Sequence, residues 1–262
     1  MTLQEQYIRK HKRRHQMISL ARLCIIAVFL LIWEVTANAG LIDPFFFSSP
    51  SRVCKSFVTL YRENSLPAHI GVTLFETLFS FLLVFGISMA AATLLWYSEK
   101  ASAVLEPYLV VLNSLPKSAL APLFIVWLGS GIKTVIVAGV SVAVFGAVIS
   151  LYTGFSLTEP EKCMLITTLG GNKKQIFQKV VLPSNILLIL STMKVNIGLS
   201  LVGVIIGEFL AARSGLGYLI IYGSQTFKMS MVITSIVILC VIAILLYLGL
   251  QLIEHWYKKR VL

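Results

Sequence analysis

The sequence predicts an all-α membrane protein with six transmembrane helices, and three observations carry that prediction. Hydrophobic residues make up 57% of the 262 residues and charged residues only 13%, whereas a soluble globular domain carries roughly 25% charged residues. Mean hydropathy is +0.88. The apolar runs recur too often for one buried core, and each is long enough to cross a bilayer core, which takes about 20 residues.

The first expected span, 18–39, follows a basic segment and imitates a secretory signal peptide. Its apolar run at 23–33 is followed by Ala37-Asn38-Ala39, which resembles a cleavage site. We expect the span to stay uncleaved, because the polar leader is long and Glu34 interrupts the apolar run. Cleavage would leave five spans and would still place the 156–182 loop in the cytoplasm.

The remaining spans are expected at 70–97, 105–128, 134–155, 183–210 and 229–253. The stretches 134–158 and 229–253 contain no Asp, Glu, Lys or Arg. We therefore expect one transmembrane domain over 18–255, with the cytoplasmic loop 156–182 within it, flanked by a basic N-terminus (1–17) and a basic C-terminus (256–262).

The basic residues predict the orientation. Six spans place 14 of the 22 Lys and Arg residues on one side: both termini, Lys100 and the 156–182 loop. The positive-inside rule makes that side the cytoplasm. The charge of +11 therefore indicates topology and contact with anionic lipid headgroups, not nucleic-acid binding. We expect the chain to lie in the plasma (inner) membrane, with both termini in the cytoplasm.

The external segment 43–67 predicts an amphipathic helix. It opens with Asp43-Pro44 and Ser48-Ser49-Pro50-Ser51 and continues with apolar residues among Arg52, Lys55 and Arg62. Ser49 or Ser51 can cap such a helix, which is expected to lie at the membrane interface. A surface helix without a specific role is the alternative.

Catalytic and metal chemistry find no support in the sequence. There is no G-x-x-x-x-G-K-[ST] phosphate loop, no G-x-S-x-G and no H-E-x-x-H. The four cysteines and four histidines are scattered, and the expected spans contain no Asp. We therefore expect no catalytic residues, no metal ligands and no cofactor in this chain.

The cytoplasmic segment 158–183 has the pattern of two short helices joined by a glycine turn. Thr158-Glu159-Pro160-Glu161 has the form of a capping box, and Gly170-Gly171 is expected to stop the first helix near Leu169. Asn172 with Gln175 predicts a second cap. Such an elbow could fit a groove on a partner, or it could simply join two spans.

The same segment resembles the cytoplasmic loop of binding-protein-dependent ABC transporter permeases. That family pattern is Glu-Ala-Ala, three residues, Gly, nine residues, Ile-x-Leu-Pro. Gly170 and Leu182-Pro183 match it in register, whereas Met164-Leu165-Ile166 replaces the triplet. The stretch 115–129, Thr73-Leu74, and Glu208 followed by the stretch 214–220 are similar to the nitrate/sulfonate/taurine branch.

The resemblance implies a type I ABC importer permease that works as a pair, as a homodimer or a heterodimer. Its implied partners are two cytoplasmic ATPase subunits, which would bind ATP and Mg²⁺, and an external solute-binding protein. The residues that would couple the permease to the ATPase are Glu161, Leu165, Ile166, Leu169, Gly170, Gly171, Phe177, Leu182 and Pro183.

Lys117 and Lys194 are candidates for the translocation path. With a rise of ~1.5 Å per residue, both are expected near the bilayer midplane, where charges are costly and often functional. Two cations suit the path of an anion. The alternatives are pairing with Glu34, Glu76 or Glu208, and snorkelling. Pro116 and Pro122 are expected to break the helical hydrogen bonding of this span, which favours a cavity-lining role. Pro116 and Glu208 complete the candidate set.

The predicted function is therefore a passive importer subunit for a small anion such as a sulfonate, taurine or nitrate. A thiamine-precursor pyrimidine is the alternative substrate, because permeases of that kind look very similar. A secondary transporter is the alternative of another class, although it would show inverted repeats and broken helices in matching halves.

Overall fold

The computed structural model describes residues 3–63 and 65–261, and each regular element within them is helical, which confirms the all-α class. The longer helices are α1 (Leu3–Asn38), α3 (Pro50–Arg62), α4 (Ser65–Tyr97), α5 (Glu99–Ser114), α6 (Lys117–Leu128), α7 (Ile132–Ser156), α11 (Ile186–Ala211), α12 (Leu216–Gln225) and α13 (Met229–Val261). The shorter ones are α2 (Pro44–Phe47), α8 (Pro160–Thr168), α9 (Lys173–Ile176), a π-helical turn (Phe177–Val181) and α10 (Leu182–Ser184).

Four of the described helices are long and apolar enough to cross a membrane: α4, α7, α11 and α13. The pair α5 and α6 makes a fifth span if its two halves count together. Helix α1 holds the expected first span, but only its part Cys24–Asn38 is apolar, and it is shorter than the others. The count of six and the location of the termini therefore stay predictions.

The expected span 105–128 is interrupted at Pro116, one of the two prolines expected to break its helix, whereas Pro122 lies inside α6. Helix α5 ends at Ser114, α6 begins at Lys117, and the two are bent by 94°. Leu115 and Pro116 adopt extended backbone at the break. Pro116 has no N–H to continue a helix, and it disfavours helical backbone at the residue before it, so the local sequence explains where the chain turns.

Helix α7 packs against α4 and α11 to form the centre of the molecule. Glycines make this approach close. A Cβ atom on Gly203 would lie 2.8 Å from the Ala138 carbonyl oxygen, and one on Gly207 would lie 2.8 Å from the Cα atom of Val135. Small residues at helix contacts let backbones approach in membrane proteins, so these positions set the spacing of the three helices.

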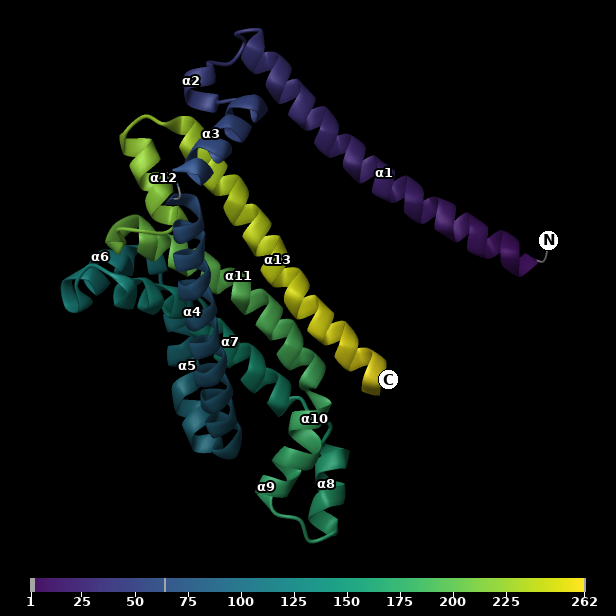
Figure 1. The fold of residues 1–262 in the computed structure, drawn as a ribbon. Helices are drawn as coiled ribbons and strands as arrows, with labels where there is room; N and C mark the ends of the chain where they lie inside the picture. Colours follow the sequence, from purple (N-terminus) through teal and green to yellow (C-terminus); the bar gives the residue numbers. More distant parts are fainter. Residues whose placement is uncertain (1–2, 64, 262) are drawn as a thin grey trace.

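The two ends of the molecule carry different elements (Figure 1). Helices α8 and α9 project at one end, whereas α2, α3 and α12 gather at the opposite end. Helix α1 runs away from the body and contacts α2 and α3 at its C-terminal end. There, Ser51 donates its backbone N–H (3.0 Å) and its hydroxyl (2.9 Å) to the Glu34 carboxylate. Glu34 therefore pairs with neither candidate lysine.

The amphipathic helix expected in 43–67 is α3. Pro50 is its first residue and Ser49 is its N-cap, since the Ser49 hydroxyl accepts from the backbone N–H of Arg52 at 3.4 Å. Of the two expected caps, Ser49 is thus the one that the structure uses. Phe57 and Tyr61 lie exposed with their rings stacked, 6.4 Å between centroids.

Candidate coupling elbow and translocation path

The elbow, residues 158–183, is built from the turn signals that the sequence contains. Pro160 opens α8, where its missing N–H costs nothing. Gly170 follows with φ +81°, a left-handed conformation that glycine adopts without a steric penalty. Asn172 and Gln175 form the expected capping box at α9: each side chain accepts from the other residue's backbone N–H, at 2.9 and 2.8 Å. The second cap is therefore confirmed.

The first expected cap was wrong. The N-cap of α8 is Glu159, and it makes no side-chain capping hydrogen bond. The Thr158 hydroxyl instead accepts from the Asn185 amide at 2.8 Å. Asn185 also donates to the carbonyl oxygen of Val181 at 2.8 Å and is itself buried. Asn185, 27 positions further along the chain, thus bonds the Thr158 hydroxyl that the local pattern assigned to the helix N-cap. This hydrogen bond joins the two ends of the elbow.

An apolar surface faces outward from α8. Leu165 is 60% exposed and Leu169 is 76% exposed, and they stand one helical turn apart. Met164 beside them is 68% exposed, and Ile166 is partly buried. Glu161 lies exposed in the first turn of the same helix. Apolar side chains presented in this way on a short projecting helix have the form of a docking surface.

Phe177 lies on the other side of the elbow and points inward, contrary to the expectation that it meets a partner. It is 8% exposed, and its ring packs against the rings of Trp96, Tyr97 and Phe155 at centroid distances of 5.2, 5.7 and 5.6 Å. It belongs to the π-helical turn, a feature that is frequent at functional sites. Phe177 therefore attaches the elbow to α4 and α7, and it does not belong to the exposed surface.

The other elbow residues support this attachment. Leu182 packs partly buried against the same aromatic core, whereas Pro183 lies exposed in α10. A Cβ atom on Gly171 would collide with the Ile166 side chain, and it would lie 2.8 Å from the Ile166 carbonyl oxygen. Lys173 reaches back to donate to the carbonyl oxygen of Tyr97 at 2.9 Å. The elbow is thus bound to the body at several points.

Lys117 lies at the break between α5 and α6. Its ammonium group donates to the carbonyl oxygens of Leu112 and Asn113, the latter at 3.3 Å, and lies 5.3 Å from the centre of the Phe145 ring. The last carbonyls of a helix lack partners within it, and a cation there is favourable. Lys117 also lines an open apolar cavity of about 470 Å³ between α4, α5, α6 and α7, so one cation borders this space.

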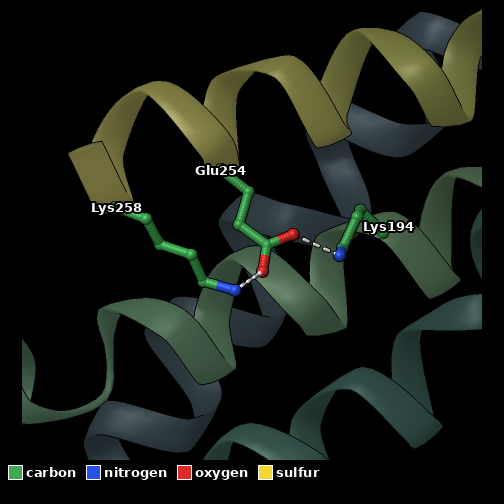
Figure 2. A network of polar contacts seen from close by, with 3 residues as sticks. All are labelled: Lys194, Glu254 and Lys258. Carbon is green, nitrogen blue, oxygen red and sulfur yellow. Dashed lines mark hydrogen bonds and ion pairs between the residues drawn. The ribbon is translucent and has the colours of Figure 1, made fainter. Parts of the chain in front are cut away.

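Lys194 lies in a different environment. It pairs with Glu254 of α13, and the second oxygen of that carboxylate accepts from Lys258 at 2.8 Å (Figure 2). The Lys194 and Glu254 side chains are 15% and 12% exposed. Lys194 thus has a carboxylate partner, as one alternative expected, but the partner is none of the three glutamates considered. Glu254 lies just beyond the expected sixth span, 229–253, where no local pattern indicates a partner.

Glu208 is an anchor within the protein. Its carboxylate, 1% exposed, accepts from the Thr73 hydroxyl at 2.6 Å and from the backbone N–H of Gly217. The same Thr73 hydroxyl accepts from the N–H of Leu216 at 2.8 Å. A Cβ atom on Gly215, whose φ is +110°, would collide with this carboxylate. Three stretches singled out in the sequence therefore meet here, and they hold the turn between α11 and α12.

The candidate path residues do not form one site. Lys117 and Pro116 lie at the α5–α6 break, Lys194 lies against α13, and Glu208 is enclosed between α4 and α12. Among the described residues, no ion pair or hydrogen bond joins these three places. In the conformation described, Lys117 lines a cavity, whereas Lys194 and Glu208 serve contacts between helices.

Comparison with known proteins places these features in a family. A family model described as "Binding-protein-dependent transport system inner membrane component" matches residues 82–262. A probable ABC transporter permease protein of Haemophilus influenzae is 30% identical over 89% of this chain and 94% of its own length. A formylaminopyrimidine transport permease protein of Halalkalibacterium halodurans is 26% identical, with the same two shares. A putative aliphatic sulfonates transport permease protein of Bacillus subtilis is 25% identical over 96% of this chain and 91% of its own.

Solved structures show the same fold. A bacterial ABC transporter involved in the import of alginate matches with a TM-score of 0.68 at 15% identity, over 97% of this chain and 99% of that one. The MetNI methionine ABC transporter in an inward-facing conformation matches with a TM-score of 0.65 at 19% identity, over 72% of this chain and 94% of that one. The helical arrangement is therefore that of ABC importer permeases.

Proposed function

We propose that this chain, which belongs to the binding-protein-dependent transport system inner membrane components, carries a small anion such as a sulfonate, taurine or nitrate. It is a multi-pass inner-membrane permease subunit of an ABC importer. ATP hydrolysis is carried out by its partner subunits. The proposed partners are a cytoplasmic ATPase pair, which binds ATP and Mg²⁺, and an external solute-binding protein. Two copies of this chain, or this chain and a similar one, form the pore.

The exposed apolar surface of the elbow carries the coupling proposal. Leu165 and Leu169 are large apolar side chains held in water by a short helix, and burial of such a side chain stabilises by about 1.5–3 kcal/mol. A groove on the ATPase supplies that burial. On the other side, Phe177 and the Asn185–Thr158 hydrogen bond join the elbow to α4, α7 and α11. Displacement of the elbow by the ATPase is thereby passed to the helices that surround the pore.

Leu169→Glu tests this coupling. The substitution puts a charge in the centre of the proposed contact, where truncation of an anchor commonly costs about 2 kcal/mol or more. We expect the ATPase to be lost from the detergent-solubilised complex while the permease keeps its elution profile and melting temperature, since Leu169 touches water in the free chain. Thr167→Glu, exposed on the same helix but off the apolar face, is the control and should keep the ATPase. Retention of the ATPase by the Leu169 variant contradicts the docking proposal.

The anion proposal rests on Lys117. It is a cation that borders a cavity beside a broken span, where irregular backbone is tolerated because it lines such a space. Lys194 no longer supports the proposal, because Glu254 neutralises it. The relatives include both a sulfonate permease and a formylaminopyrimidine permease at nearly equal identity, so a thiamine-precursor pyrimidine remains the second candidate substrate.

Uptake measurements separate these candidates. In proteoliposomes, wild-type uptake should need ATP and the binding protein; uptake driven by an ion gradient alone would indicate a secondary transporter.

Lys117→Met keeps the aliphatic stem of the side chain and removes its charge. We expect it to lower the maximal uptake rate of a sulfonate at least several-fold with the ATPase still bound. Unchanged sulfonate uptake would remove the structural support for an anion.

A further inference from the structure

Two glutamates meet inside the protein where α4, α11 and α12 pack against one another. Glu76 of α4 is 2% exposed, and Glu208 of α11 is as deeply buried. Glu76 follows Thr73 by three residues on α4, so both side chains lie on the helix face that meets Glu208. The two carboxyl groups are in hydrogen-bond contact with each other. A pair of acids is therefore enclosed between helices that are far apart in the sequence.

The two carboxyl groups differ in the donors around them. Glu208 accepts from the Thr73 hydroxyl and from two backbone N–H groups in the first turn of α12. The Oε2 atom of Glu76 is buried, and no donor among the described residues reaches it. The Thr77 hydroxyl, next along the chain, forms no hydrogen bond and supplies none to Glu76. Donors stabilise the ionised form of a carboxyl group, so the site is built for an anion at Glu208 and not at Glu76.

No counter-ion balances a second negative charge here. Among the described residues, no ion pair includes either glutamate. The Nδ1 atom of His69, on α4, accepts from the Gly215 N–H at 2.9 Å, so this imidazole is neutral. Tyr218 of α12 stacks its ring on His69.

The cations on the surrounding elements point elsewhere. Those of α6, α7 and the turns around α12 are Lys117, Lys133, Arg213 and Lys228. Lys117 donates to the end of α5, and the other three are exposed. Helix α13, which packs on α11 and α12, carries its charged residues from Glu254 onward. The Glu76 carboxyl group therefore faces another acid without a cation to offset it.

We propose that the Glu76–Glu208 pair is a proton-binding site, in which protonated Glu76 donates a hydrogen bond to the Glu208 anion and thereby fixes α4 to the turn between α11 and α12. Two carboxyl groups that share a buried site cannot both ionise without a large penalty. A proton removes that penalty and gives the Glu76 carboxyl group a partner. Loss of the proton places two negative charges together, so the contact weakens as the pH rises.

A bound metal cation is the other way to hold two carboxylates together, and the geometry favours a proton. The carboxyl groups are in hydrogen-bond contact with each other, which leaves no place for an ion between them. The oxygens of Glu208 already accept from a hydroxyl and from backbone N–H groups. Those donors point their positive ends at the site and would repel a cation.

The difference between the two acids gives the first test, which uses the complete permease with its ATPase in nanodiscs. Glu76→Gln keeps a donor where the proton is proposed, so the melting temperature of the permease at neutral pH should equal or exceed that of the wild type. Glu208→Gln turns an NH₂ group toward Thr73 or toward the Gly217 N–H, so a donor faces a donor and the melting temperature should fall. Equal effects of the two substitutions, or a larger loss in Glu76→Gln, overturn the proposal.

Infrared difference spectroscopy reads the proton itself. A protonated carboxylic acid shows a carbonyl stretching band that an ionised carboxylate lacks. The spectrum of the wild type minus that of Glu76→Gln should contain this band at neutral pH. Glu99→Gln makes the same change on an exposed residue at the start of α5, and its difference spectrum should lack the band. Absence of the band from the Glu76 difference spectrum contradicts the proposed proton.

The dependence of stability on pH gives the third test. The folded chain would hold a proton that an exposed glutamate in the unfolded chain has lost, so wild-type stability should fall as the pH rises above neutral. Glu76→Gln lacks this proton, and its melting temperature should therefore rise relative to the wild type with pH. A difference that stays constant with pH overturns the proposal. So does a wild-type melting temperature that depends on sodium concentration at fixed ionic strength, which would indicate a bound cation.

Discussion

At the scale of single residues, the polar side chains of Glu208 and Lys194 hold helices and turns together and do not line a path. Glu208 shows why sequence alone could not assign it. Its motif with the stretch 214–220 is visible, but the Thr73 hydroxyl and the Gly217 N–H that use its oxygens come from α4 and α12. Lys194 is similar, since its partner Glu254 lies 60 positions away on another helix. Distant contacts of this kind leave no local signal.

Gly217→Ala tests the Glu208 anchor. A Cβ atom there would lie 2.7 Å from a carboxylate oxygen of Glu208 and 2.8 Å from its Cβ atom, both in a fully buried setting. We expect overpacking to cost about 1–3 kcal/mol and to lower the melting temperature of the purified permease. Gly249→Ala is the matched control: nothing lies within 4 Å of its added Cβ atom in α13, and the helix should gain up to about 1 kcal/mol. Equal melting temperatures for the two variants would contradict the anchor.

At the scale of elements, the sequence predicted the helices well and their bends less well. Gly170, Pro160 and the Asn172–Gln175 box are local signals, and the structure uses all three in the elbow. The break at Pro116 was also signalled, yet a bend of 94° depends on how α6 packs against α7 and not on the proline alone. The Thr158 cap failed because Asn185 competes for the same hydroxyl.

The contact between α11 and α13 makes a testable claim at this scale. Glu254 binds Lys194 and Lys258 together (Figure 2), so Glu254→Gln leaves a partly enclosed lysine without its charge partner. Breaking one side of such a pair is more harmful than removing both. We therefore expect the melting temperature to fall in Glu254→Gln and to recover in the double variant with Lys194→Met, as a coupled pair requires. Additive losses in the double variant would show that the two residues act independently.

At the scale of the whole molecule, the two ends present different surfaces. The elbow end presents apolar side chains of α8, whereas the opposite end presents the exposed phenylalanine side chains of α2. The distribution of basic residues predicted which end lies in the cytoplasm, because charge bias acts on each loop separately and needs no tertiary contact. The count of spans is harder to obtain, since α1 is only partly apolar and the third span is broken.

The most direct test of the account is therefore the sidedness of these two ends. In a variant whose four native cysteines are replaced, Lys174→Cys in the elbow and Arg62→Cys at the end of α3 are each treated with a membrane-impermeant maleimide, and both positions are exposed. We expect Arg62→Cys to react in intact spheroplasts, whereas Lys174→Cys should react only after the membrane is permeabilised. Labelling of Lys174→Cys from outside would contradict the account, because the elbow could then meet no cytoplasmic ATPase.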